Sequence, residues 1–465
     1  MTPLSATNHT IPHSKNRNSP VRIHNMRILT TITAAGLAGL TLSACGQSSS
    51  LDAAAPIDGA AVAEATDVDT CDPNETIHVA FSSLAEEPME TAIAAMNERF
   101  PELTIDAVPS AFTSYGDLTQ QIVSDIAVGN RPDIIMTGLG QMQFWVDSYN
   151  PNPIDIDSLP EDYQTQFLGA GTARDGVTYL APAQISAPVM AANQDILDEA
   201  GAGPAEDIKT YDDLLKAAQL IADNTDYTPV SIPPQGLPEW FTQALLQNSG
   251  ADLANEDGTA AFGDEAGIAA LDIWSELGSR DLEAGVPGTA DTLNLFNAGE
   301  LGIGMITTSN IASMNESIGD QFNWTPIRIP SIDGVQDRAL PAGGNGYMVL
   351  SEDSCRAAFS NELISELVQP ETVMQASGTQ RSYIPVSREA RDELLASDAA
   401  NPQMTFAWTF ENDLTQWGDG FPGEHTAPIY DAIELMDEKL QQGEDTATVV
   451  TEAVATIDGI VGGAN

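Results

Sequence analysis

The residue with the clearest chemical role is Cys45, which closes the run Leu42-Ser43-Ala44-Cys45. This run ends an uncharged apolar stretch, residues 28–42, that comes directly after Arg27. A basic residue, an apolar stretch and small residues before a cysteine are typical of a bacterial lipoprotein export signal. We therefore expect residues 1–44 to be removed and the Cys45 thiol to carry a lipid. The mature chain would then lie outside the cytoplasm, anchored to the cell membrane.

Two alternatives remain open at this end of the chain. The apolar stretch is shorter than the roughly 20 residues that span a membrane, yet it could be a short anchor or a core helix. Residues 1–25 could be upstream sequence that is never translated, because Met26-Arg27 would also make a compact start. Residues 45–70 are rich in Ala, Ser and Asp without a periodic pattern, so we expect a flexible tether there.

Two cysteines remain if Cys45 is lipidated, namely Cys71 and Cys355. Two cysteines left over in an exported protein are more often paired than free. We expect a disulfide between them, which would bring the start of the folded body beside a much later segment. Two unpaired thiols are the alternative.

Residues suited to catalysis are few. Of five histidines, only His78 and His425 lie beyond the expected signal, and His78 belongs to an apolar, strand-like run that indicates a structural role. The sequence contains no His-Glu-x-x-His or Gly-x-Ser-x-Gly run, the motifs of zinc and serine hydrolases. Acidic residues are abundant, but no two of them stand out as a catalytic pair. We therefore expect no enzymatic activity, no metal site and no cofactor.

The charge of the chain excludes some partners. Removing residues 1–44 would take away four basic residues and no acidic one, which leaves 13 basic against 68 acidic residues and a net charge near −55. Such a field repels nucleic acid and anionic lipid surfaces, so neither is expected as a partner. With about 420 mature residues, of which a large share is apolar, the chain can bury the cores of two or three domains.

The body of the chain alternates between strand-like and helix-like patterns. Short apolar runs at 77–81, 103–108 and 133–136 predict strands, and helices with one apolar face are expected at 88–100 and 117–128. Two successive strand-helix-strand units of this length favour a parallel sheet flanked by helices. Further helices are expected over residues 210–221, 264–278, 355–368, 429–440 and 446–460.

Six stretches follow one another in a characteristic order: AVGNRPD at 127–133, DGVTYLAP at 175–182, ANQDILDEAG at 192–201, TYDDL at 210–214, LFNAGELGIGM at 295–305 and YIPV at 383–386. Each stretch alone is moderately specific, and together they cover nearly the whole mature chain. In this order they resemble the extracellular solute-binding proteins of bacterial ABC importers, in the branch that includes sugar and glycerol-phosphate binders.

The resemblance implies an α/β fold of two lobes, the periplasmic-binding-protein-like fold, with hinge strands and a cleft between the lobes that closes on a ligand. Lobe 1 would hold residues 71–183 and 326–372, and lobe 2 would hold residues 184–325 and 373–465. Cys71 and Cys355 would then share lobe 1, so their disulfide would not obstruct the hinge.

The family's ligand-contact positions fall here on hydroxyl, amide and aromatic side chains. These suit a sugar, whose hydroxyls pair with polar groups and whose ring stacks on aromatic faces. Trp240 and Trp417 could be stacking platforms or core residues, and Ser309 could instead cap the helix that follows it. The implied ligand-binding residues are Tyr115, Gln184, Ser186, Trp240, Thr308, Ser309, Gly344 and Tyr383.

A phosphate-bearing ligand is the alternative to a neutral sugar. The run 307–310 and the pair Gly343-Gly344 could present hydroxyls and amides to a phosphate, and Arg381 could supply a positive charge. However, residues 418–430, where the glycerol-phosphate branch would place an arginine, contain none, and a carboxylate of that branch would align near Gly138. We therefore expect a carbohydrate or polyol, with glycerol 3-phosphate or a glycerophosphodiester as the alternative.

The expected partners follow from the same resemblance. They are the small-molecule solute and an ABC permease in the membrane, which would receive the solute from the closed form of a monomer. A surface adhesion or scaffolding protein that uses the same fold is the alternative from another functional class.

Overall fold

The computed structural model describes residues 66–111, 114–335, 337–379, 381–418 and 420–463. The expected export signal, Cys45 and most of the expected tether lie outside these residues. Within the described part, no helix is both long enough and apolar enough to cross a membrane.

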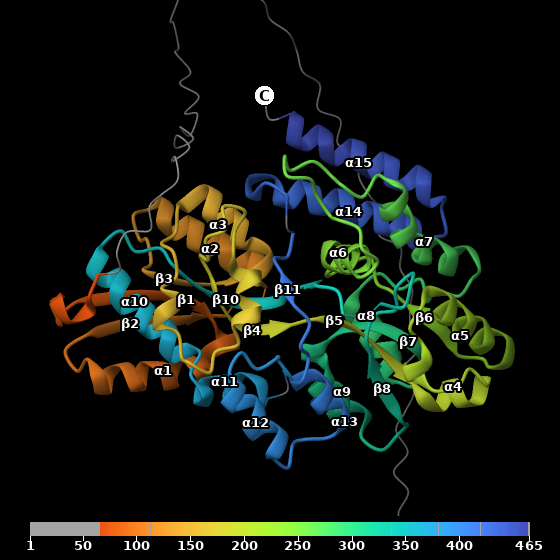
Figure 1. Cartoon of the computed structure of the whole chain (residues 1–465), viewed down its shortest axis with the longest axis horizontal. Coiled ribbons are helices and arrows are strands. Elements are labelled where there is room, and N and C mark those ends of the chain that lie inside the picture. The colour runs from red at the N-terminus through yellow and green to blue at the C-terminus, as the bar shows by residue number, and fades with distance from the viewer. Residues whose placement is uncertain (1–65, 112–113, 336, 380, 419, 464–465) are drawn as a thin grey trace, which may run out of the picture. The chain divides into compact units, whose positions relative to one another are not determined.

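A five-stranded mixed sheet is built from the first part of the chain and one later strand (Figure 1). Its order is β2-β1-β3-β10-β4; β1 pairs in parallel with β2 and β3, whereas β10 runs antiparallel to β3 and β4. The three parallel strands confirm the predicted strand-helix-strand units, and β10 comes from a glycine-rich segment that the sequence did not identify as a strand. The strands are β1 (Thr76–Ser82), β2 (Thr104–Ser110), β3 (Ile134–Gly138), β4 (Ala181–Ser186) and β10 (Gly343–Val349).

Helices cover this first sheet, and most begin and end where the sequence predicts. Ser114 caps the N-terminus of α2 by accepting the Asp117 amide, and Leu118 and Ile122 are buried on its inner face. Arg99, in the last turn of α1, pairs with Glu362 and Glu366 of α10. The helices are α1 (Glu86–Arg99), α2 (Tyr115–Ala127), α3 (Met142–Tyr149), α10 (Ser354–Leu367) and α11 (Pro370–Ser377).

A second, four-stranded sheet has the order β6-β7-β5-β8, in which β7 is parallel to β6 and antiparallel to β5. The predicted helix at 210–221 is α5, and its N-terminus carries the expected capping box of Thr210 and Asp213. The strands and surrounding helices are β5 (Pro188–Asn193), β6 (Thr228–Ser231), β7 (Leu301–Thr307), β8 (Trp324–Ile327), α4 (Gln194–Ala200), α5 (Tyr211–Asn224), α8 (Thr289–Asn297), α9 (Ile311–Ile318) and α13 (Pro402–Trp408).

Four further helices pack on one another above the second sheet in the view of Figure 1. They include the three predicted at 264–278, 429–440 and 446–460. These helices are α6 (Pro238–Asn248), α7 (Glu265–Ser279), α14 (Thr426–Gln441) and α15 (Thr446–Gly462).

The remaining elements are short. Helix α12 (Arg388–Ala396) packs on α11 and α13, and a parallel pair of strands, β9 (Leu340–Pro341) with β11 (Leu414–Thr415), lies next to α6. The 3₁₀ helices are η1 (Val68–Thr70), η2 (Ser83–Ala85), η3 (Leu139–Gln141), η4 (Ile156–Ser158), η5 (Thr165–Gly171), η6 (Ala205–Asp207), η7 (Thr308–Asn310) and η8 (Gly423–His425).

Three of the predicted lobe boundaries fall inside regular elements of the structure. The boundary at 183 falls inside β4 of the first sheet, and the boundary at 326 falls inside β8 of the second. The boundary at 372 falls inside α11, which packs against α1 and β4. In each case the regular element continues past the predicted position, because its main-chain hydrogen bonds or buried face hold it to one side.

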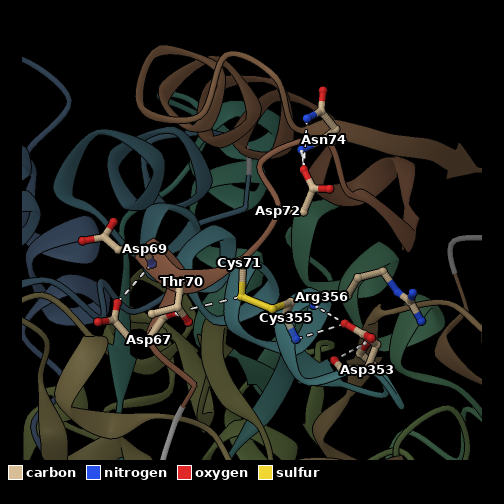
Figure 2. Close-up of a disulfide and its surroundings, with 10 residues drawn as sticks. Asp67, Asp69, Thr70, Cys71, Asp72, Asn74, Asp353, Cys355 and Arg356 are labelled. Carbon is tan, nitrogen blue, oxygen red and sulfur yellow. Dashed lines mark hydrogen bonds between the residues drawn. A yellow bond between two sulfur atoms is a disulfide. The ribbon is translucent and has the colours of Figure 1, made fainter.

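The predicted disulfide between Cys71 and Cys355 is confirmed (Figure 2). Cys71 follows η1, and Cys355 lies in the first turn of α10, with their Cα atoms 5.5 Å apart. Asp353 caps α10 by accepting the amides of Cys355 and Arg356. The bond therefore ties the first described segment to a helix that covers the first sheet.

Candidate ligand site

Two aromatic side chains lie against the segment that follows β3, where glycine leaves room for them. A Cβ atom on Gly138 would be 2.7 Å from the ring of Tyr115, and a Cβ atom on Gly140 would be 2.9 Å from the indole of Trp417. Tyr115 opens α2 of the first lobe, whereas Trp417 follows β11 and is held by α6 of the other lobe. We call this meeting point, at the carboxyl end of β3, the junction.

An amide network lies beside Tyr115 at the junction. The Asn345 side-chain amide donates to the Tyr115 hydroxyl and to Gln184 Oε1, at 2.9 Å in both cases. Asn345 is fully buried, yet its Oδ1 atom has no partner, and neither has Oε1 of the nearby Gln141. Burial, followed by the influence of Tyr383, raises the pKa of Tyr115 well above its usual value, so the phenol stays neutral. The network thus offers neutral donors and acceptors.

The segment that carries Arg381 and Tyr383 is fixed to both lobes. The Ser382 hydroxyl donates to the Thr308 carbonyl beside β7 at 2.7 Å, and the Ile384 amide donates to the Ile185 carbonyl of β4 at 2.9 Å. Tyr383 is buried next to Tyr115, while Arg381 is exposed. Among the arginines that the structure describes, only Arg381 has a guanidinium group with no hydrogen bond or ion pair.

The backbone is held in place on each side of Trp417, at Gln416 and at Gly418. The buried Gln243 of α6 donates to the Gln416 carbonyl at 2.9 Å and accepts the Gly418 amide at 2.8 Å. The Trp240 ring lies 5.6 Å from the Trp417 ring, centroid to centroid, but its indole N–H is bonded to the Pro341 carbonyl. Trp240 is 1% exposed and serves as core, whereas Trp417 is partly exposed.

A buried carboxyl lies beside Trp417. Glu239, in the first turn of α6, is 7% exposed, and burial raises its pKa to about 7, while hydrogen bonding from its own backbone amide and from the Trp417 indole lowers the pKa in part. Burial is the main cause that raises the pKa values of Tyr430 and Asp437 of α14. The nearby charge of Glu239 raises both values further. This part of the junction is therefore acidic and shielded from water.

The remaining predicted site residues lie around the crossing between β4 and β5. The backbone of Gly343 passes between Trp240 and the hydroxyl of the buried Ser186. Gly344 has a positive φ of 98°, and a Cβ atom there would be 1.9 Å from the Gln184 carbonyl, so the strand itself requires glycine. Whether Ser186 or Gly344 touches a ligand stays a prediction.

Thr308 and Ser309 are engaged by their own surroundings. Thr308 is fully buried, and its hydroxyl accepts the Ala187 amide at 3.1 Å, which supports the crossing strand. The cap of η7 is Thr307, which accepts the Ser309 amide and also bonds to the Ser309 hydroxyl. The helix that follows, α9, has Asn310 at its N-cap position and no side-chain cap, so the alternative that Ser309 caps this helix is wrong.

The structure adds four residues to those that the sequence singled out for binding. Asn345 lies in a glycine-rich stretch that gave only a weak signal, and Gln141 lies in a 3₁₀ turn. Glu239 and Gln243 stand out in retrospect, because α6 is buried on almost every side and yet carries an acid and an amide. A polar residue in an otherwise buried helix is the pattern that could have identified them.

One direct contact joins α3 to the segment before α14. The Gly423 amide donates to Asp147 Oδ2 at 2.9 Å, and Gln143 donates to the other oxygen of the same carboxylate. A Cβ atom on Gly423 would be 2.4 Å from the Phe144 amide nitrogen, so the two backbones approach closely here. Together with Trp417 on Gly140, this contact joins the two lobes near the site.

Comparisons with known proteins agree with this architecture. Residues 91–405 match the family model described as bacterial extracellular solute-binding protein. An arabinooligosaccharide-binding protein of Halalkalibacterium halodurans is 25% identical over 207 residues, which is 44% of this chain and 45% of that relative. The chain thus matches less than half the length of this curated relative.

Solved structures show the same fold at lower identity. The sugar-binding protein MalE from Xanthomonas citri is 17% identical with a TM-score of 0.68, over 84% of this chain and 98% of that one. UgpB from Mycobacterium tuberculosis, in complex with glycerophosphocholine, is 18% identical with a TM-score of 0.67, over 85% of this chain and 99% of that one. The fold is therefore the predicted two-lobe α/β fold of periplasmic binding proteins, and the chain belongs to the family of bacterial extracellular solute-binding proteins.

Proposed function

We propose that this protein captures a carbohydrate or polyol at the junction of its two lobes and delivers it to an ABC permease. The observation that carries the proposal is the composition of the junction. Two aromatic rings, Tyr115 and Trp417, lie there with neutral amides whose buried oxygen atoms lack partners, as in Asn345 and Gln141. Aromatic faces and paired donors and acceptors are what a hydroxylated ring requires.

The relatives support the same ligand class. One is named for arabinooligosaccharide binding and another is a MalE sugar-binding protein. Capture rather than turnover is the activity that we propose, in keeping with the binding role of this family.

A thermal-shift panel tests the proposal directly. The panel should contain maltotriose, an arabinotriose, glycerol and glycerophosphocholine. A solute present at 100 times its Kd stabilises the folded protein by about 2.7 kcal/mol, so a true ligand raises the unfolding temperature by several degrees. A rise with a saccharide or polyol supports the proposal. If nothing in a wide panel of sugars, polyols and phosphodiesters has an effect, the scaffolding alternative is favoured instead.

A glycerophosphodiester is the second candidate, and one observation favours it. Arg381 carries a guanidinium group without a protein partner, on the edge of the cluster of Tyr115 and Tyr383. Against it, this arginine stands alone, whereas phosphate sites combine several donors and positive charges.

The variant Arg381→Gln separates the two candidates. If the ligand is neutral, its Kd in the variant stays within about threefold of the wild-type value, since an exposed charge contributes little to a neutral partner. If the ligand carries a phosphate, the loss of a charge-assisted hydrogen bond raises the Kd about 10- to 100-fold. Titration calorimetry with maltotriose and with glycerophosphocholine distinguishes these outcomes.

Anchoring, delivery and hinge motion belong to the same proposal. The signal pattern ending at Cys45 supports a lipid anchor, and membership of the solute-binding family supports a permease partner. The lobes would close by bending at the crossings after β4, after β8 and after α11. Palmitate labelling of wild type and Cys45→Ala in a bacterial host tests the anchor, since the variant should take up no label.

A further inference from the structure

The segment between β11 and α14 contacts both lobes along its length. We call residues 414–418 and 420–425 the strap. The strap begins in β11, carries Trp417 and ends in η8. Its β11 end packs against η5 of the first lobe and pairs with β9 beside α6, and its η8 end packs against both α3 and α14. The strap therefore bridges the two lobes at several places and not at Trp417 alone.

On the first-lobe side, glycine lets the strap approach very closely. A Cβ atom on Gly169 of η5 would be 2.9 Å from a carbonyl oxygen of β11, and one on Gly140 of η3 would be 2.9 Å from the Trp417 indole. A Cβ atom on Gly423 of the strap itself would be 2.4 Å from the Phe144 amide nitrogen of α3. Cβ atoms hardly ever come within 3.0 Å of another residue. A side chain at any of these glycines would therefore push the strap away from the first lobe.

On the second-lobe side, hydrogen bonds hold the strap to α6. The Gln243 side chain bonds to the backbone on each side of Trp417, at 2.9 and 2.8 Å. The Thr415 hydroxyl donates to Oε1 of Gln247, from the same helix, at 3.0 Å. These bonds, together with the pairing of β11 with β9, should keep the strap with the second lobe when the lobes move apart.

The contact with α3 is weaker. The Gly423 amide donates to Asp147 Oδ2 at 2.9 Å, and Gln143 donates to the other oxygen of the same carboxylate. Asp147 is exposed, so water competes for this bond and it contributes modestly to stability. Gly423 does not have a positive φ. The close approach to α3, rather than the turn itself, thus requires glycine, and the contact can break while the strap keeps its own conformation.

We propose that the strap is a latch that moves with the second lobe and docks on α3, η3 and η5 as the lobes close, so that the contact between Gly423 and Asp147 sets the fraction of unliganded protein that is closed. The effect on affinity rests on the proposed function. An apparent Kd equals the Kd of the binding-competent form divided by the fraction of protein in that form. A weaker latch should therefore lower the affinity for every ligand of the junction by the same factor.

Small-angle X-ray scattering of the full chain without ligand tests the latch. Gly423→Ala should give a larger radius of gyration than the wild type, because its Cβ atom cannot lie against the α3 backbone. Asp147→Ala should act in the same direction but less strongly. The controls are Gly459→Ala in α15, where a Cβ atom meets nothing within 4 Å, and Ser148→Ala, at an exposed neighbour of Asp147 in α3. Both controls should scatter as the wild type does.

Titration calorimetry with maltotriose and with arabinotriose tests the effect on binding. We expect Gly423→Ala to raise the Kd about 10- to 100-fold and Asp147→Ala to raise it about 3- to 10-fold. Each factor should be the same for both saccharides if the wild type binds both. Because the two substitutions act on one contact, the double variant should be weaker by clearly less than the product of the single factors.

The outcomes separate this inference from the proposed function. If the wild type binds neither saccharide, the proposed function fails, and the scattering comparison still decides whether the latch exists. If Gly423→Ala and the wild type scatter alike without ligand, the inference is overturned even when a saccharide binds. A Kd of Gly423→Ala within twofold of the wild-type value, or factors that differ clearly between two bound saccharides, also overturns it. Unfolding temperatures establish that each variant is folded, and Asp147→Ala decides the question if Gly423→Ala does not fold.

Discussion

The buried carboxyl of Glu239 makes a prediction about stability that needs no ligand. Its pKa is about 7 in the folded protein against an ordinary value of 4.5. The folded protein therefore keeps a proton that the unfolded chain has lost between these two pH values. Since the folded state binds more protons in this window, the free energy of unfolding falls as pH rises through it. A difference of 2.5 pKa units, from 4.5 to 7, corresponds to about 3 kcal/mol at 1.36 kcal/mol per unit.

The substitution Glu239→Gln removes this cost while keeping the shape of the side chain. At pH 4 the variant should be as stable as the wild type, whereas at pH 8 it should be more stable by about 3 kcal/mol. Urea unfolding followed by circular dichroism, at pH values from 4 to 8, measures the difference. Other titrating groups, such as Glu283 and Asp437, are present in both proteins and cancel in the comparison.

The control for this experiment is Glu265→Gln. It removes an exposed acid from the same position of another helix, where only the helix dipole is affected, so its effect should stay below about 1 kcal/mol at every pH. A Glu239→Gln variant that is no more stable than the wild type at pH 8 would refute the reasoning. It would mean that the carboxyl has a partner or reaches water. The expected result would show a group retained at a cost to stability, which is typical of a functional site.

Two further predictions concern the covalent and backbone framework. Replacing both Cys71 and Cys355 by serine should lower the free energy of unfolding by about 2–5 kcal/mol, because the bond closes a loop with a sequence separation of 284; dithiothreitol should reproduce the loss in the wild type and leave the double variant unchanged. Gly344→Ala should cost about 2–3 kcal/mol through strain at positive φ and contact with the Gln184 carbonyl. Gly201→Ala is its control, since Gly201 has a positive φ with open space around it and should cost about 1 kcal/mol. Equal losses at the two glycines would contradict the steric argument.

The elements of the fold could be predicted from local patterns. The strand at 77–81 and the helix at 117–128 are found as β1 and α2, since alternation of apolar residues and a capping serine are short-range features. The strand β10 was missed because Gly343, Gly344 and Gly346 have low strand propensity, and their place in the sheet depends on neighbours far away in the chain. The exact lobe boundaries stay a prediction, since the end of an element depends on what it packs against.

The sequence by itself determined the family and the two-lobe architecture and favoured the pairing of Cys71 with Cys355, because each rests on residue types whose order or number is informative. It did not determine the site. Glu239 and Trp417 are separated by 178 positions, and nothing in the sequence around either one indicates the other. Only the tertiary structure brings the Glu239 carboxyl and the Trp417 indole together, since the neighbours of a buried side chain are a property of position in space.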